Sequence, residues 1–223
     1  MNFFVTKIVE DSDVTYNLTV AGYVALAAVM LVVFAAGCMF QDKNKKMDAK
    51  QIAFCAMAMA LAVVTSMFKI IDMPMGGSVT LFSMLFIVLT GYWFGVRTGI
   101  TTAVAYGILQ LLINPYIISI WQMLMDYVFA FGALGLAGLF SNKKKGLIKG
   151  YIAGILGRYF FSFLSGWIFF AVYTPDFFNS AILYSLAYNG AYIGLEAAIT
   201  LIVLALPPVN EAMQAVKKLV CEA

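Results

Sequence analysis

The sequence contains no histidine and few charged residues, and both absences narrow its chemistry. Only 11% of its 223 residues are charged, and without histidine it lacks the commonest proton shuttle and metal ligand. Its three cysteines, Cys38, Cys55 and Cys221, do not have the spacing of a metal site. No glycine-rich phosphate loop of the Walker type is present, which excludes ATP hydrolysis by that route. We therefore expect no metal, no cofactor and no catalytic residue.

Apolar residues dominate what is present. They make up 63% of the chain, and the mean hydropathy is +0.93. A soluble domain of this length could not hide so much apolar surface, because about half of its area must stay in contact with water. The net charge of +3 does not indicate a nucleic-acid partner, since the basic residues are sorted by side along the chain. The partner implied by composition is the lipid bilayer.

Runs of about 20 apolar residues predict seven membrane-spanning helices. We place them at residues 18–40, 51–69, 79–95, 98–114, 117–140, 147–171 and 181–206. A polar, basic linker separates the first span from the others. The predicted organisation is an extra transmembrane helix with its linker (1–50), a six-helix substrate-binding domain (51–206) and a cytoplasmic tail (207–223). The predicted fold class is an all-α integral membrane protein, with a six-helix bundle preceded by one additional N-terminal transmembrane helix.

The basic residues predict the orientation of these spans. If seven spans alternate, one side carries Lys43, Lys45, Lys46, Lys50, Arg97, Lys143, Lys144, Lys145, Lys149, Lys217 and Lys218. The opposite side carries only Lys7 and Lys69 together with several acids. Cytoplasmic loops are enriched in lysine and arginine. We therefore expect a multi-pass protein of the plasma membrane with its N-terminus outside and its C-terminus in the cytoplasm.

Asp126 is a single carboxylate inside the apolar run of the fifth predicted span. A charge at such a depth costs roughly 2.5–3.5 kcal/mol on insertion scales, so it indicates a functional role. Gln122 precedes it by four residues and is expected on the same helix face. The alternative is a protonated, hydrogen-bonded packing residue.

Arg158 and Glu196 are the other two charges deep in predicted spans. At 1.5 Å of rise per residue, both come close to mid-depth, at similar heights. We expect a structural ion pair that holds the last two spans together. A substrate role is the alternative, and a proton relay that also includes Asp126 would instead indicate a proton-coupled transporter or a membrane enzyme.

Polar and aromatic residues predicted near the height of Asp126 suggest a cavity open to the outside. Tyr184, Tyr188 and Asn189 come from the last span, and Ser162 and Trp167 from the sixth. One carboxylate among amides and aromatic rings suits an organic cation with flat rings, through charge pairing and cation–π contacts. The outer loop at residues 72–79 contains Pro followed by Gly-Gly, which fits either a lid or an ordinary turn.

Small residues at four-residue spacing predict close helix contacts in lipid. The second span contains Ala56, Ala58, Ala60 and Ala62, which serve either internal packing or a partner subunit. Gly132, Gly135 and Gly138 in the fifth span are expected to pack internally.

Three runs, in order, resemble the signature segments of one transporter family. They begin at Gly76-Gly77-Ser78-Val79-Thr80, at Gln122-Met123-Leu124-Met125-Asp126-Tyr127 and at Tyr184-Ser185-Leu186-Ala187-Tyr188-Asn189. They resemble the thiamine-specific S component, the substrate-binding membrane subunit of energy-coupling factor (ECF) transporters. The resemblance covers about residues 50–206 and leaves out the first span.

The resemblance implies a subunit that binds thiamine or a related compound from outside and is not an enzyme. It implies a transmembrane coupling subunit and two ATPase subunits as partners. It places Asp126, Tyr127, Tyr184 and Asn189 at the cationic vitamin and the alanine face of the second span at the coupling subunit. A histidine in the sixth span and a tryptophan in the outer loop, both expected from the family, are missing here. Part of the aromatic cage that would stack on the ligand is therefore expected to be built from other residues.

Overall fold

The computed structural model describes residues 5–10, 13–22, 24, 28 and 48–222. Of the first predicted span, 18–40, the described residues are 18–22, 24 and 28, and 20–22, 24 and 28 are helical. Most of the linker after it also lies outside the described residues. That span therefore stays a prediction. The remaining six predicted spans are all present as helices.

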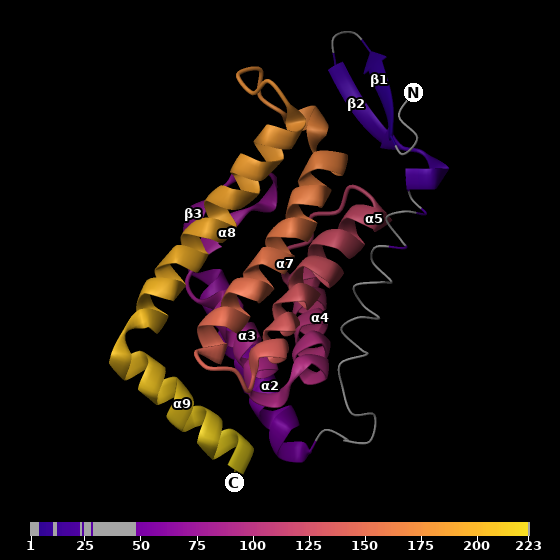
Figure 1. Ribbon diagram of the computed structural model, residues 1–223. Coiled ribbons are helices and arrows are strands. Elements are labelled where there is room, and N and C mark those ends of the chain that lie inside the picture. The colour runs from indigo at the N-terminus through magenta and orange to yellow at the C-terminus, as the bar shows by residue number, and fades with distance from the viewer. Residues whose placement is uncertain (1–4, 11–12, 23, 25–27, 29–47, 223) are drawn as a thin grey trace.

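In the described part of the chain, six helical segments form the bundle, and Figure 1 shows their arrangement. They are α2 (Ala49–Met67), α3 (Ser83–Phe94), α4 (Val96–Ile113), a composite helix at Ile120–Phe140, α7 (Gly146–Phe169) and α8 (Ala181–Ala205). All but the shorter α3 are long and apolar enough to cross a membrane. The predicted all-α membrane bundle is confirmed, with boundaries within a few residues of those expected.

The composite helix changes its winding along its length. It starts as α5 (Ile120–Met123), widens into a π-helical segment, η2 (Leu124–Phe129), returns to α6 (Ala130–Gly132) and ends as a 3₁₀ helix, η3 (Ala133–Phe140). A π-helical turn has hydrogen bonds between residues five apart, so it contains more residues than an α-helical turn, and it is frequent at functional sites. Asp126 lies inside this π-helical segment.

Glycines allow the helices to cross closely at one end of the bundle. A side chain at Gly99 of α4 would lie 2.9 Å from the carbonyl oxygen of Gly135, and one at Gly91 of α3 would lie equally close to that oxygen. On α7, a side chain at Gly150 would come within 2.8 Å of the Ala137 carbonyl oxygen. Gly135 and Gly138 therefore pack internally, as expected. We call this region the glycine crossing.

Two short antiparallel hairpins were not expected from the sequence. β1 (Val5–Glu10) pairs with β2 (Asp13–Leu18), which contacts the short helix η4 (Ala171–Tyr173) and α7. β3 (Lys69–Asp72) pairs with β4 (Ser78–Thr80) around a single 3₁₀ turn, η1 (Pro74–Gly76). Gly76 has a φ of 87°, which explains why glycine stands there. We call Lys69–Thr80 the outer hairpin.

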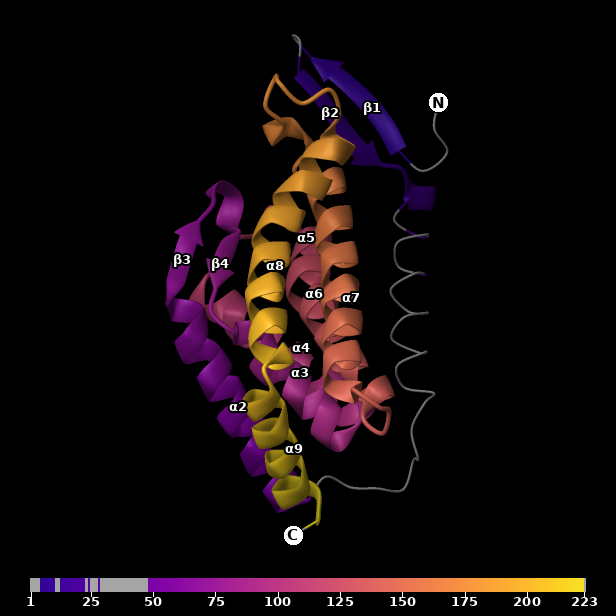
Figure 2. The same ribbon diagram turned by 60° about the vertical axis from the view of Figure 1, so that its left-hand side comes forward.

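The C-terminal segment, predicted as a cytoplasmic tail, is a helix. α9 (Pro207–Glu222) turns back beneath the bundle and runs toward the start of α2 (Figure 2). Its less exposed apolar residues, Val209, Met213, Val216 and Val220, follow helical spacing on one face. The Lys50 ammonium donates to the Leu219 carbonyl oxygen at 2.9 Å. Thus α9 closes the end of the bundle that carries the predicted cytoplasmic lysines.

Candidate ligand-binding site

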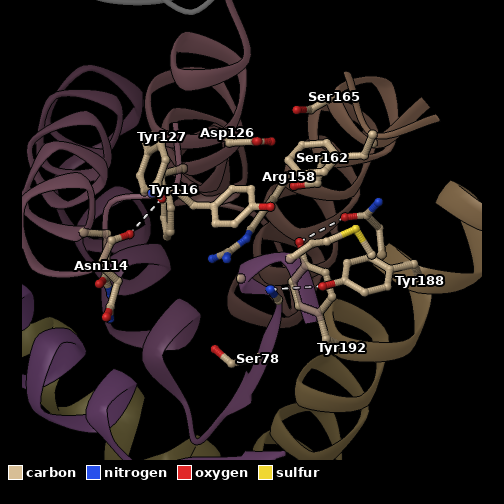
Figure 3. Close-up of a pocket in the computed structure, with 18 of the residues that line it drawn as sticks. Ser78, Asn114, Tyr116, Asp126, Tyr127, Arg158, Ser162, Ser165, Tyr188 and Tyr192 are labelled. Atoms are coloured by element: carbon tan, nitrogen blue, oxygen red, sulfur yellow. Dashed lines mark hydrogen bonds between the residues drawn. The ribbon is translucent and has the colours of Figure 1, made fainter. Parts of the chain in front are cut away.

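A cavity of about 400 Å³ opens between the outer hairpin, the start of the composite helix, α7 and α8. The outer hairpin, which lines it, lies at the end of the bundle away from α9 (Figure 2). Figure 3 shows side chains from several elements pointing into it. Its polar and aromatic lining includes Tyr116, Gln122, Asp126, Tyr127, Arg158, Ser162, Ser165, Tyr184, Tyr188, Asn189 and Tyr192. Seven of the eight predicted ligand-binding residues are among them.

Gln122 holds the Asp126 carboxylate in place. The Gln122 amide donates to Asp126 Oδ2 at 2.7 Å and to the Tyr116 carbonyl oxygen at 3.1 Å. Its oxygen accepts from the Ile118 backbone N–H at 3.0 Å. Gln122 is buried and its amide is satisfied on both sides, so it has little freedom to turn. The Asp126 carboxylate is thus held in a fixed position at the cavity wall.

Tyrosine rings form much of the wall. On α8, the rings of Tyr184 and Tyr188 lie 5.8 Å apart, and those of Tyr188 and Tyr192 lie 5.7 Å apart. Tyr116 stacks on Phe170 at 5.7 Å. Such faces offer stacking and cation–π contacts to a flat cation.

Two lining side chains also fix their neighbours. The Tyr127 hydroxyl donates to the Asn114 carbonyl oxygen at 2.8 Å and accepts from the Tyr116 N–H at 3.0 Å. The Asn189 oxygen accepts from the Tyr192 hydroxyl at 3.0 Å. Tyr127 and Asn189 therefore orient the aromatic wall besides lining the cavity.

The outer hairpin covers one side of the cavity and is held by Tyr188. The Tyr188 hydroxyl accepts from the Gly77 N–H at 3.0 Å and donates to the Pro74 carbonyl oxygen. A side chain at Gly77 would collide with the Tyr188 ring. The loop is thus a hairpin that lines the cavity, and its role as a lid stays a prediction.

The predicted ion pair between Arg158 and Glu196 is wrong. Within the described ranges, the salt bridge that the structure contains joins Lys69 to Asp72 at the surface, at 3.0 Å, and not Arg158 to Glu196. The Arg158 guanidinium points into the cavity and lies 4.2 Å from the centre of the Phe131 ring. The depth of the two charges was estimated from the sequence, but the rotation of their helices was not.

Glu196 faces the start of α3 instead. It accepts hydrogen bonds from the Thr80 hydroxyl at 2.6 Å, the Ser83 hydroxyl at 3.1 Å and the Met84 N–H at 3.2 Å. Asp126, in contrast, pairs with Gln122. The two acids thus belong to separate hydrogen-bond networks in the described part of the chain, which does not favour a relay through both.

Trp167 is the one predicted ligand contact that does not line the cavity. It stacks on Phe163 at 6.2 Å. Ser162, Ser165 and Gly166 occupy the cavity face of α7, and the next residue turns about 100° away from Gly166 at 3.6 residues per turn.

The sequence analysis missed Tyr192 and Tyr116 as lining residues. Tyr192 follows Tyr188 by four residues, so helical spacing alone would have found it. Tyr116 lies between two spans after Asn114-Pro115, where no periodicity indicates a direction.

The alanine stripe of α2 divides between two faces. Ala58 is 4% exposed and Ala62 is fully buried, whereas Ala56 and Ala60 are exposed. Prediction of a docking role for Ala58 and Ala62 is therefore wrong, because these two pack inside the bundle. Ala56 and Ala60 share the outer face with the exposed Met57 and Val64.

The chain resembles known thiamine transporters in both sequence and structure. The sequence model of the thiamine transporter protein family matches residues 52–216. The thiamine transporter ThiT of Bacillus subtilis (strain 168) is 34% identical over 165 residues, which are 68% of this chain and 84% of that protein. A solved structure of ThiT from Listeria monocytogenes has a TM-score of 0.58 at 24% identity, and the match covers 71% of this chain and 94% of that one. The structural likeness shows a shared fold.

Proposed function

This chain belongs to the thiamine transporter protein family, and on that premise we propose that it captures thiamine, or a closely related cation, for an ATP-driven importer. The observation that carries the proposal is the Asp126 carboxylate, held by Gln122 in a cavity walled by tyrosine rings. Within this proposal the chain is a binding subunit and performs no chemistry on its ligand.

Thiamine has the chemistry that this cavity offers to a ligand. It joins a positively charged thiazolium ring to a flat aminopyrimidine ring, and it is small enough for a cavity of about 400 Å³. A carboxylate can accept hydrogen bonds from the amino group and balance the charge, while tyrosine faces stack on the rings. Asp126, Tyr116 and Tyr188 are the residues that we assign to these contacts.

The aromatic wall is built from tyrosine rather than tryptophan. No tryptophan is among the cavity-lining residues of the described chain, and Ser162, Ser165 and Gly166 form the cavity face of α7 in a sequence without histidine. Tyrosine offers a weaker cation–π face than tryptophan but adds a hydroxyl. Related cations, such as thiamine precursors with the same pyrimidine, therefore belong to the ligand class that we propose.

We assign the basic end of the bundle to the cytoplasm and the cavity to the outside. This end, opposite the outer hairpin, contains the first turns of α2, α4 and α7 and the helix α9. These segments carry Lys50, Arg97, Lys149 and Lys217. Enrichment of basic residues on the cytoplasmic side supports the assignment. In this orientation a ligand enters from outside beneath the outer hairpin.

Coupling to ATP hydrolysis requires partner chains. We propose that a transmembrane coupling subunit docks on the outer face of α2 around Ala56 and Ala60, and that two ATPase subunits drive release inside. Small exposed residues at four-residue spacing allow a partner helix to approach closely in lipid. The exposed methionine and valine beside them supply apolar contact area.

Binding of thiamine to the detergent-purified chain tests the proposal directly. Because no tryptophan lines the cavity, intrinsic fluorescence is a poor reporter, and isothermal titration calorimetry is the appropriate measurement. We expect one saturable site with submicromolar affinity, and weaker binding of thiochrome, the neutral oxidation product of thiamine. Binding of a different vitamin instead would change the proposed ligand and leave the proposed role as a binding subunit in place. Absence of heat with flat cationic and neutral vitamins alike would refute the capture function.

A further inference from the structure

Glu196 connects the middle of α8 to the base of the outer hairpin. Both of its carboxylate oxygens are used: Oε2 accepts from the hydroxyl of Thr80, the last residue of β4, and Oε1 accepts from the Ser83 hydroxyl and the Met84 N–H. The Thr80 and Ser83 hydroxyls are also in contact, at 2.7 Å. All three side chains are buried. One carboxylate therefore gathers the end of the hairpin and the start of α3.

The start of α3 depends on this carboxylate. Phe82, the residue before the helix, has a left-handed backbone with a φ of 61°, and its side chain cannot accept a hydrogen bond. The first turn of a helix has N–H groups without partners inside the helix, and it favours a negative charge nearby. Glu196 supplies both the acceptor and the charge from another helix.

The same face of α8 also holds the tip of the outer hairpin. Tyr188, two turns before Glu196, bonds to Gly77 and Pro74. Between these two attachments, Asn189 and Tyr192 line the cavity. The cavity is thus bounded by one helix and by a hairpin fastened to that helix at both its tip and its base.

We propose, on the basis of the function proposed above, that Glu196 is a positioning residue that keeps the outer hairpin closed over bound ligand. Its carboxylate fixes Thr80 and Ser83, which themselves line the cavity. It therefore sets the angle between the hairpin and α3. Glu196 therefore controls the release of ligand without touching it. It also explains why an acid is retained at this depth without a basic partner within ion-pair distance in the described chain.

The first test uses the hairpin itself and needs no ligand. Ser78, in β4, is replaced by cysteine in a chain whose Cys38, Cys55 and Cys221 are serine, and its rate of labelling by a water-soluble maleimide is measured. Glu196→Gln keeps the shape of the side chain but presents an amide N–H₂ to one of the hydroxyl donors. We expect labelling to become about tenfold faster, because buried hydrogen bonds to a charged group are lost. An unchanged rate would refute the proposal.

The second test measures thiamine release from the same variants by dilution of radiolabelled complex. We expect release about tenfold faster in Glu196→Gln and a nearly unchanged association rate. Thr80→Val removes one donor and leaves Glu196 in place, so it should change release in the same direction. Adding it to Glu196→Gln should have less effect than adding it to the wild type, because the two changes remove one shared hydrogen bond.

Thr200→Val is the matched control. Its buried hydroxyl donates to the Glu196 backbone oxygen at 2.8 Å, one turn further along α8, and the side chain does not line the cavity. It should lower the melting temperature without changing labelling or release. If Glu196→Gln behaved in the same way, its role would be structural only and the proposal would be refuted. If the wild type bound no thiamine but labelling still responded to Glu196→Gln, the ligand assignment would fail and the hairpin-positioning role would stand.

Discussion

Replacing Asp126 with asparagine removes one negative charge from the cavity and almost nothing else. The two side chains have nearly the same volume, and asparagine still offers an oxygen to the Gln122 amide. Gln122 also keeps its hydrogen bonds to the Tyr116 carbonyl oxygen and the Ile118 N–H. The geometry of the site should therefore survive the substitution, so that a change in affinity reports the charge.

The expected loss of affinity follows from the local environment. A cation about 4 Å from the carboxylate gains roughly 4 kcal/mol at an effective dielectric constant of about 20, before desolvation is subtracted. Measured hydrogen bonds to charged groups contribute about 1.5–3 kcal/mol net, which corresponds to about 10- to 150-fold in the dissociation constant. We expect Asp126→Asn to weaken thiamine binding within this range, measured by calorimetry at fixed pH and salt.

The ligand-free chain should respond differently. A half-buried charge that has no cation within ion-pair distance in the described part of the chain costs free energy, so Asp126→Asn should leave the melting temperature of the unliganded protein unchanged or higher. Asp176→Asn is the control, because Asp176 is exposed and lies outside the cavity while carrying the same charge. An affinity within threefold of wild type for Asp126→Asn, or an equal loss for Asp176→Asn, would refute the proposed pairing.

Three further changes probe other parts of the molecule. Gly135→Ala places a methyl group against the backbone of α4 and should lower the melting temperature by several degrees in differential scanning calorimetry. Gly194 has open space around it, so Gly194→Ala should leave the melting temperature unchanged or raise it. Ala56→Leu should abolish co-purification with the coupling subunit while thiamine binding persists, and the equally exposed Ala198→Leu should affect neither. Tyr188→Phe removes two hydrogen bonds to the outer hairpin and should speed thiamine release about 5- to 30-fold in a dilution assay; an unchanged rate would mean that these bonds do not hold the ligand in.

The helices and the contact between Gln122 and Asp126 could be predicted, because both depend on local spacing. Apolar runs long enough for a bilayer gave six helices with boundaries within a few residues. The contact between Gln122 and Asp126 follows from a separation of four residues on one helix. The aromatic face of Tyr184 and Tyr188 follows from the same rule.

What could not be predicted depends on how separate helices rotate against each other. Arg158 and Glu196 were placed at similar depth, but their directions are set by helix packing that no local pattern encodes. Half of the alanine stripe turned inward for the same reason. The outer hairpin is a short element whose stability comes from contacts with the bundle, so its sequence carries a weak signal of its own. The apolar residues of α9 do have helical spacing, but its position against the bundle is set by contacts that no local pattern encodes.

The glycine crossing has a consequence for how proteins of this architecture can diversify. At that end, backbone meets backbone, and nearly any side chain added at Gly99, Gly135 or Gly138 would force the helices apart. At the cavity end the walls are side chains, and most of them can be exchanged without moving the main chain. New ligands should therefore be acquired by changes confined to one half of the molecule, while the other half stays constant and remains compatible with the same membrane partner. A laboratory selection for altered vitamin specificity should accumulate its substitutions on that side of the bundle.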